Sequence, residues 1–218
     1  MKKTDIAEFY RRLAERTPNP VTELESGNTY QLLVAVALSA QATDAGVNRA
    51  TRDLFRDVKT PAQMLALGEH GLKHHIRTIG LFNGKAKNVI ALSRVLVDQY
   101  DGEVPRDRDA LQALPGVGRK TANVVLNVAF GEEAFPVDTH VFRVANRTGL
   151  AKGKNVNQVE AKLEKETPAP YRVSAHHLLI LHGRYVCKAR KPECWRCVVA
   201  DLCAFKPKTP PPADAGKP

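Results

Sequence analysis

The sequence lacks any apolar run that approaches the ~20 residues needed to cross a membrane. Its N-terminal stretch, Met1–Asp5, is polar and lacks the apolar core of a signal peptide, so we expect an intracellular, cytoplasmic protein. Cysteine is absent outside the short segment from Cys187 to Cys203, which holds all four. In a reducing compartment, cysteines gathered in this way favour a metal site over disulfides.

Acidic residues are scarce beside basic ones, with 23 Asp and Glu against 33 Lys and Arg. The resulting net charge of +10 and pI of about 9.6 indicate a polyanionic partner, for which nucleic acid is the usual choice. The 218 residues are 43% hydrophobic, which is enough for a core in one large domain or two small ones.

Strand patterns and internal repeats are also missing, and apolar residues recur mostly at helical spacing. The all-apolar run Leu32–Leu38 fits a buried strand or a buried helix, but its leucine and alanine content favours a helix. Thr29 and Thr60 precede periodic segments as candidate helix caps, and Gly68 is a candidate stop. The stretch Ser39–Asp44 is expected to hold a helix end, a short polar corner and a new cap. We therefore predict an all-α fold of about ten or more ordinary helices.

The segment Leu114–Ala122 predicts two helices joined by a tight hairpin, with a glycine on each side of Val117. Glycines permit positive φ and leave backbone amides uncovered, and such amides at a helix N-terminus bind anions. Lys120 lies in the first turn of the second helix, where the helix dipole disfavours a positive charge. If Lys120 is also partly buried, its pKa falls and it can act as a free amine. The alternative interpretation is a plain phosphate contact or a solvated lysine.

The cysteines follow the pattern C-x6-C-x2-C-x5-C and form the second strong signal, at Cys187, Cys194, Cys197 and Cys203. Four thiolates in one short loop suit either zinc or an iron–sulfur cluster, and the spacing alone leaves the metal open. The loop is rich in lysine and arginine, including Lys191, which predicts contact with a DNA backbone. Alternatively, these charges only balance an anionic cluster.

Four segments together resemble the endonuclease III family of base-excision DNA glycosylases, and they occur in that family's order and spacing. They are Leu38–Asp44, Leu114–Ala122, Val137–Arg143 and the cysteine loop. The resemblance covers nearly all of the chain from Tyr30 to Cys203 and implies a 4Fe–4S cluster at the four cysteines.

The resemblance also implies two helical domains flanking a DNA-binding cleft, in which Lys120 and Asp138 meet. One domain, residues 23–134, is a six-helix barrel with the helix-hairpin-helix. The other is an iron–sulfur cluster domain made of residues 1–22 and 135–206. We expect disorder in the proline-rich tail, 207–218.

The implied activity is removal of oxidised pyrimidines such as thymine glycol from duplex DNA, followed by strand cleavage by β-elimination, in a monomeric, nucleoid-associated enzyme. Lys120 is the implied nucleophile, and Asp138 stabilises positive charge on the sugar or shuttles protons. Gln41 fills the gap in the base stack and Leu81 wedges from the other side. The other implied DNA contacts are Gly116, Val117, Gly118, Arg119 and Lys191.

Simpler roles remain for several of these side chains. Asp138 is well placed to cap the helix that follows it, which is compatible with a catalytic role. Gln41 fits an ordinary helix end, and Leu81 fits core packing equally well. His140 and the pair His176–His177 are interpreted as structural.

Alternatives for the whole chain are an abasic-site lyase, a glycosylase for another lesion, and a non-enzymatic DNA-binding module. Lys120 and Asp138 together argue against the module, because a binder needs neither at these positions. Monofunctional relatives lack a lysine at the position of Lys120, which favours a bifunctional enzyme.

Overall fold

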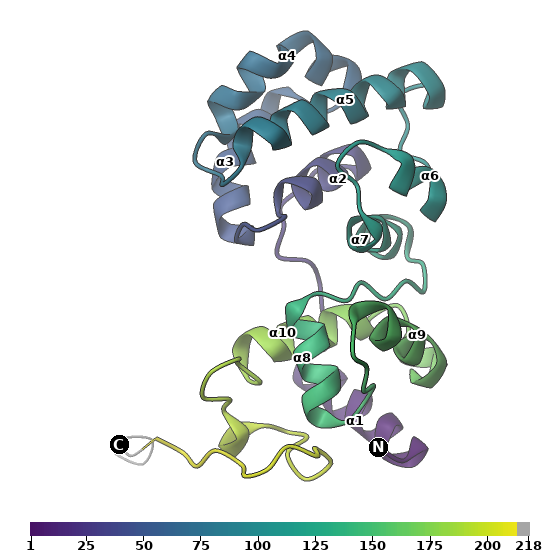
Figure 1. Ribbon diagram of the computed structural model, residues 1–218, viewed down its shortest axis with the longest axis vertical. Coiled ribbons are helices and arrows are strands. Elements are labelled where there is room, and N and C mark those ends of the chain that lie inside the picture. Colours follow the sequence, from purple (N-terminus) through teal and green to yellow (C-terminus); the bar gives the residue numbers. More distant parts are fainter. Residues whose placement is uncertain (213–218) are drawn as a thin grey trace. The chain divides into compact units, whose positions relative to one another are not determined.

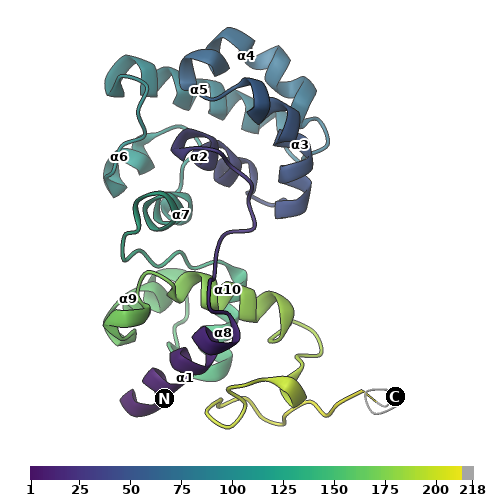
Figure 2. The same cartoon turned by 180° about the vertical axis from the view of Figure 1, so that it is seen from behind.

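The computed structural model describes residues 1–212, and in this range all regular secondary structure is helical, with no strand. Figures 1 and 2 show the helices from two opposite sides. The prediction of an all-α fold is confirmed. No helix among the described residues is both long enough and apolar enough to cross a membrane.

The chain forms two compact units, each described here by itself. The hairpin unit is residues 22–132, and the cysteine unit combines residues 1–21 with the chain from Glu133 onward. The helices of the hairpin unit are α2 (Thr29–Leu38), α3 (Asp44–Asp57), α4 (Pro61–Ile76), α5 (Phe82–Tyr100), α6 (Arg108–Ala113) and α7 (Arg119–Phe130).

Helix α2 is the central helix of the hairpin unit, because it packs against α3, α5 and α7. This explains its composition: a helix covered on several sides is apolar all round, and every residue of Leu32–Val36 is buried. The choice of helix over strand for Leu32–Leu38 is therefore confirmed. The α4 and α5 helices lie side by side above it in Figure 1.

Side-chain caps begin several of these helices, although one cap lies one residue before the expected position. Asn28, and not Thr29, caps α2 by accepting a hydrogen bond from the Gln31 amide. Thr43, within the stretch expected to hold a new cap, caps α3. Thr60 caps α4, with proline at the first helical position, as the sequence predicts, and the structure adds a capping box with Gln63.

Glycine 68 interrupts α4 with φ of 73°, so the expected stop at this residue takes the form of a kink between two helical stretches. The positive φ is accessible to glycine at no steric cost. The second stretch ends at Ile76, shortly before the turn that carries Leu81 into α5.

The described part of the cysteine unit contains four α-helices and two short 3-10 helices. They are α1 (Lys3–Arg16), α8 (Thr139–Thr148), α9 (Val156–Glu166), η1 (Ala169–Tyr171), α10 (Ala175–Tyr185) and η2 (Cys194–Arg196). Helix α1 contributes its apolar face to the core, where it packs against α10. Tyr10 in this face stacks on Tyr171 and pairs its hydroxyl with Thr167 at 3.0 Å. These contacts join the N-terminal helix to segments more than 150 residues away.

The start of the proline-rich tail differs from the expectation of disorder from residue 207. Lys208 donates a hydrogen bond from Nζ to the carbonyl oxygen of Cys203 at 2.8 Å. The Thr209 hydroxyl accepts one from the Cys194 amide at 3.1 Å. The expectation is wrong for these two residues because the cysteine loop offers them backbone partners. Residues 213–218, for which disorder was also expected, lie outside the described part of the chain.

Candidate functional site

The hairpin between α6 and α7 is closed by a backbone hydrogen bond from Val117 to Leu114 at 3.1 Å. Gly116 has φ of 77°, and a Cβ at this position would lie 2.8 Å from the Cβ of Asn88 on α5. Only glycine fits both conditions without strain. Gly118 differs from the expectation, since its φ of −89° is open to any residue and a Cβ there would meet nothing within 4 Å.

Helices α5 and α7 are the two helices of the hairpin unit whose N-cap residue supplies no side-chain hydrogen bond. Their N-caps are Leu81 and Gly118, whereas a side chain of Asn28, Thr43, Thr60 or Asp107 caps each of the other four. A helix start without a side-chain cap retains amide groups and a positive dipole end for an external anion. The two uncapped starts coincide with two predicted DNA contacts.

Lys120 lies in the first turn of α7, next to Arg119, and both side chains are exposed. The partial burial considered in the sequence is therefore not found. The role of Lys120 as a nucleophile stays a prediction.

Asp138 is the N-cap of α8, where its Oδ1 accepts hydrogen bonds from the amides of His140 and Val141, both at 2.8 Å. The expected capping role is confirmed. Both bonds use the same oxygen, and no hydrogen bond to Oδ2 occurs among the described residues. The side chain is half-buried, so the second oxygen is a carboxylate acceptor close to the surface.

Backbone conformation marks three further predicted contacts. Four residues other than glycine have positive φ in residues 1–212, and three of them are Gln41 at 55°, Leu81 at 61° and Lys191 at 50°. The fourth, Asp101, is the C-cap of α5. A left-handed conformation costs a non-glycine residue about 1–2 kcal/mol. Such strain collects at functional sites. All three side chains are exposed, Leu81 to 67%, so the alternative of core packing for Leu81 is wrong.

Lys120 belongs to the hairpin unit and Asp138 to the cysteine unit. Their meeting in one cleft stays a prediction. Within its own unit, the hairpin brings Gly116, Val117, Gly118 and Arg119 together with Lys120, because these residues are consecutive.

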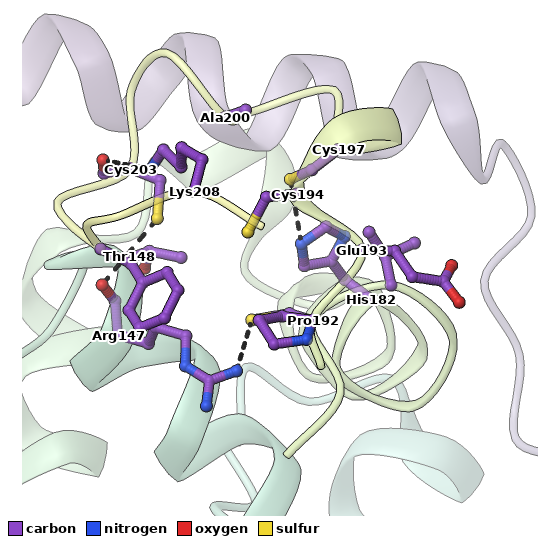
Figure 3. Close-up of a pocket in the computed structure, with 13 residues that line it drawn as sticks. Arg147, Thr148, His182, Pro192, Glu193, Cys194, Cys197, Ala200, Cys203 and Lys208 are labelled. Atoms are coloured by element: carbon purple, nitrogen blue, oxygen red, sulfur yellow. Dashed lines mark hydrogen bonds between the residues drawn. The ribbon is translucent and has the colours of Figure 1, made fainter. Parts of the chain in front are cut away.

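The four cysteine side chains line one pocket, shown in Figure 3. All four are free thiols. Four thiols that line one pocket suit a metal group held by thiolate ligands.

Burial around this pocket disfavours a bare thiolate. It raises the pKa of the Cys197 thiol to about 11, and it also raises the pKa of Cys187. The thiolates are stable here when a cationic metal group compensates them. When the four cysteines hold such a group, it cross-links four positions of a loop that has little regular secondary structure and thereby stabilises the fold of the loop.

Two arginines of α8 support the loop, and the sequence reading missed both. Arg143 donates hydrogen bonds to the carbonyl oxygens of Cys187 at 3.0 Å and Gly183 at 2.8 Å. Arg147, one turn later, donates to the carbonyl oxygen of Lys188 at 2.7 Å and to the Sγ of Cys187 at 3.6 Å. The available signal was their i, i+4 spacing, which places both side chains on one face of α8.

The pair His176–His177, interpreted from the sequence as structural, is buried in α10. His176 is buried and its Nδ1 hydrogen-bonds to the carbonyl oxygen of Pro136 at 2.8 Å. Burial also lowers the pKa of His177. His182 was missed. Its Nε2 lies 3.6 Å from the Sγ of Cys197, and burial, with the nearby Arg196, lowers its pKa to about 4.

The charges of the loop divide into paired and exposed groups. Lys188 and Arg196 both form ion pairs with Glu193, and these hydrogen bonds hold the pKa of the Glu193 carboxyl below its usual range. Arg190 and Lys191 are exposed. Some charges of the loop are therefore neutralised by Glu193, and others are exposed; contact of the loop with DNA stays a prediction.

Comparison with known proteins identifies the family. Residues 34–169 match the family described as HhH-GPD superfamily base excision DNA repair protein, and residues 187–203 match the iron-sulfur binding domain of endonuclease III. The chain is 58% identical over 208 residues to endonuclease III of Escherichia coli K12, covering 95% of this chain and 99% of that protein. It is 56% identical to endonuclease III of Haemophilus influenzae, with the same coverage of both chains.

Solved structures agree with these relatives. A trapped endonuclease III–DNA covalent intermediate and a non-covalent endonuclease III–DNA complex each match with a TM-score of 0.88 and 45% identity, over 94% of this chain and 96% of theirs. The four cysteines fall within the matched iron–sulfur segment. The chain therefore belongs to the HhH-GPD superfamily of base excision DNA repair proteins and, within it, to the endonuclease III family of DNA glycosylases with AP lyase activity.

Proposed function

We propose that this enzyme removes oxidised pyrimidines, such as thymine glycol, from duplex DNA and then cleaves the abasic site through a Schiff base on Lys120. It works as a monomer in the cytoplasm, in association with the nucleoid. The observation that carries the proposal is the exposed lysine in the first turn of α7, directly after the Gly116 hairpin. A covalent intermediate with DNA has been trapped for a relative that is 45% identical to this chain.

The hairpin binds the DNA backbone. Gly118 leaves the start of α7 without a side-chain cap, and Gly116 keeps the turn close to α5. A phosphate bound at this helix start is stabilised by the positive end of the helix dipole and by the positive charge of Arg119. The uncapped start of α5, next to Leu81, offers a second position of the same kind. Lys191 in the cysteine loop provides a further backbone contact.

Gln41 and Leu81 hold the duplex open. A duplex hides the sugar C1′ of a damaged nucleotide, so the nucleotide must be extruded before the base can be removed. Both residues are exposed and have a backbone in the left-handed region. An amide can replace the lost base in its stack, and an apolar wedge can separate adjacent base pairs.

The chemistry begins with the neutral amine of Lys120. Its lone pair forms a bond to C1′ while the bond from C1′ to the base breaks, and the base leaves with a proton. Opening of the sugar ring yields a Schiff base between C1′ and Nζ, which makes the C2′ proton acidic. Removal of this proton expels the 3′ phosphate by β-elimination. This is covalent catalysis by an activated lysine.

Asp138 contributes the carboxylate charge. Oδ1 is committed to the cap of α8, so Oδ2 is the oxygen assigned to the developing positive charge on the sugar. A fixed carboxylate stabilises that charge without reorganisation when the reaction occurs.

Borohydride trapping on a duplex with one thymine glycol tests the proposal. Borohydride reduces the Schiff base to a stable amine, so the wild-type enzyme should yield a covalent protein–DNA adduct. Lys120→Arg keeps the positive charge but cannot form the Schiff base, and it should bind DNA without trapping. Arg119→Ala is the matched control: binding should weaken, but trapping should persist at saturating enzyme.

The substrate and the nucleophile are tested separately by a second duplex with an abasic site. Trapping there, but not on thymine glycol, would support the abasic-site lyase or a glycosylase for another lesion. Absence of trapping on both, with DNA binding retained, would support the non-enzymatic module and refute the proposal. A Lys120→Arg adduct equal to that of the wild type would assign the nucleophile elsewhere.

A further inference from the structure

Two side chains other than the cysteines contact sulfur in the cysteine pocket. The Nε2 of His182, in the last turn of α10, lies 3.6 Å from the Sγ of Cys197. The Nη1 of Arg147, in the last turn of α8, lies at the same distance from the Sγ of Cys187. Both side chains line the pocket, and Figure 3 shows them approaching it from different helices.

Both contacts are fixed by the surrounding fold. The guanidinium of Arg147 also donates hydrogen bonds to the carbonyl oxygens of Lys188 and Ala189, and it lies 5.0 Å from the ring centroid of Phe205. His182 is buried, and its carbonyl oxygen accepts the amides of Val186 and Cys187 at 3.0 and 2.8 Å. The Arg147 guanidinium is therefore held by contacts that do not involve sulfur, and the His182 imidazole is buried beside the Sγ of Cys197.

The four thiols differ in this support. Cys187 and Cys197 each have a side-chain donor, whereas the contact of the Cys203 sulfur is with the carbonyl oxygen of Arg147 at 3.9 Å. No side-chain donor reaches the Sγ of Cys194 among the described residues. A cluster-bound thiolate carries no proton and can only accept, so the imidazole must hold its proton on Nε2 to make this bond.

We propose that His182 and Arg147 are positioning residues of the iron–sulfur site, which hold the thiolates of Cys197 and Cys187 and thereby set the lifetime and reduction potential of the cluster. A hydrogen bond to a ligating thiolate orients it and opposes its release. It also draws negative charge from the sulfur, which favours the reduced, more negative cluster and raises the potential.

His182→Leu and His182→Gln, in the full-length enzyme loaded with its cluster, test the histidine. The leucine removes the donor, while the glutamine amide can replace Nε2–H. We expect His182→Leu to lose its visible cluster absorption about 10-fold faster under air and chelator. Its potential, measured by protein-film voltammetry without DNA, should move negative, and His182→Gln should restore both properties toward wild type.

His177→Leu is the matched control, because it makes the same change at a buried histidine on the same helix. It should leave the rate of cluster loss and the potential unchanged. If His182→Leu stays within twofold of wild type in the rate of loss and has an unaltered potential, the proposal is wrong. It is also wrong if His182→Gln behaves as His182→Leu does, because burial and not the hydrogen bond would then explain the effect.

Arg147→Met provides an independent test from the other helix. It removes a donor and a positive charge, so its cluster should be lost faster and its potential should move further negative than in His182→Leu. An unchanged potential in Arg147→Met with a retained cluster would overturn the role of Arg147. Because no DNA is present in these measurements, they do not depend on the proposed substrate or nucleophile.

Discussion

Replacement of Asp138 separates the two roles of its carboxylate, because asparagine can take over one of them. Oδ1 accepts two backbone amides at 2.8 Å at the start of α8. Asparagine is as good an N-cap as aspartate, since its side-chain oxygen accepts the same amides. Alanine has no oxygen and loses the cap. Both substitutions remove the negative charge, which is the property assigned to catalysis.

The magnitudes follow from these contacts. Loss of the cap in Asp138→Ala costs about 1 kcal/mol, and loss of the charge at the helix start adds about 0.5 kcal/mol. For a chain of this size, about 1 kcal/mol lowers the melting temperature by about 2–4 °C. We therefore expect a decrease of about 3–6 °C for Asp138→Ala and about 1–2 °C for Asp138→Asn. Both variants should lose about 100-fold or more in base-excision rate.

Asn155→Ala is the matched control. Asn155 caps α9 in the same unit by accepting the amide of Gln158 at 3.0 Å. Its loss should lower the melting temperature by about 2–4 °C, with no loss of activity. Thermal melts followed by circular dichroism give the stabilities, and single-turnover cleavage of a thymine glycol duplex gives the rates.

The reasoning fails if Asp138→Asn cleaves at the wild-type rate, because the carboxylate would then be a cap and nothing more. It fails in another way if Asp138→Asn melts as low as Asp138→Ala. In that case the hydrogen bonds to Oδ1 would not be the main stabilising contribution of this side chain.

Three further predictions concern the hairpin unit. Gly116→Ala should destabilise the enzyme by about 1–2 kcal/mol, because the alanine would adopt positive φ and its Cβ would lie 2.8 Å from Asn88. Gly118→Ala, where a Cβ meets nothing within 4 Å, should change the melting temperature by less than about 2 °C. Leu81→Gly relieves a left-handed conformation and should stabilise the protein by about 0.5–1 kcal/mol, yet it should weaken binding to a lesion duplex in a fluorescence-anisotropy titration. The buried Nζ of Lys85 has no hydrogen-bond partner among the described residues, and burial lowers the pKa of this amine. Between the lowered pKa and the ordinary value of 10.5, the unfolded chain therefore binds more protons than the folded chain does. Wild-type stability should rise with pH in this window, and Lys85→Met should remove that rise in urea titrations at successive pH values; an equal slope in both proteins would contradict the assignment.

The sequence was informative where the signal is local. The cap at Thr60, the break at Gly68 and the cap at Asp138 each depend on residues within one turn of the chain, and the structure has them as expected. The cap of α2 at Asn28, one residue before the expected Thr29, shows the limit, since neighbouring polar residues are nearly equivalent as caps. Resemblance at four motifs supplied the family, which comparison of nearly the whole chain confirms.

Contacts between residues far apart in the chain could not be predicted from the sequence in this way. The approach of Asn88 to Gly116 brings α5 against the hairpin, which lies well beyond it in the sequence, and no periodic pattern marks such a pair. The same holds for Arg143 and Arg147, which support the cysteine loop about 40 residues further along the chain. In the sequence alone, these two residues cannot be distinguished from arginines that face solvent.

The sequence by itself determined that this chain is helical, basic and built around a glycine hairpin and four clustered cysteines, because helix periodicity, net charge and short motifs are local or additive properties. Only the tertiary structure decided that Gly116 requires glycine while Gly118 does not. It also decided that Leu81 is exposed on a strained backbone, and that His182 and Arg147 face the sulfurs of the cysteine pocket. Each of these depends on which side chains meet across elements, and packing fixes that only once the whole chain has folded.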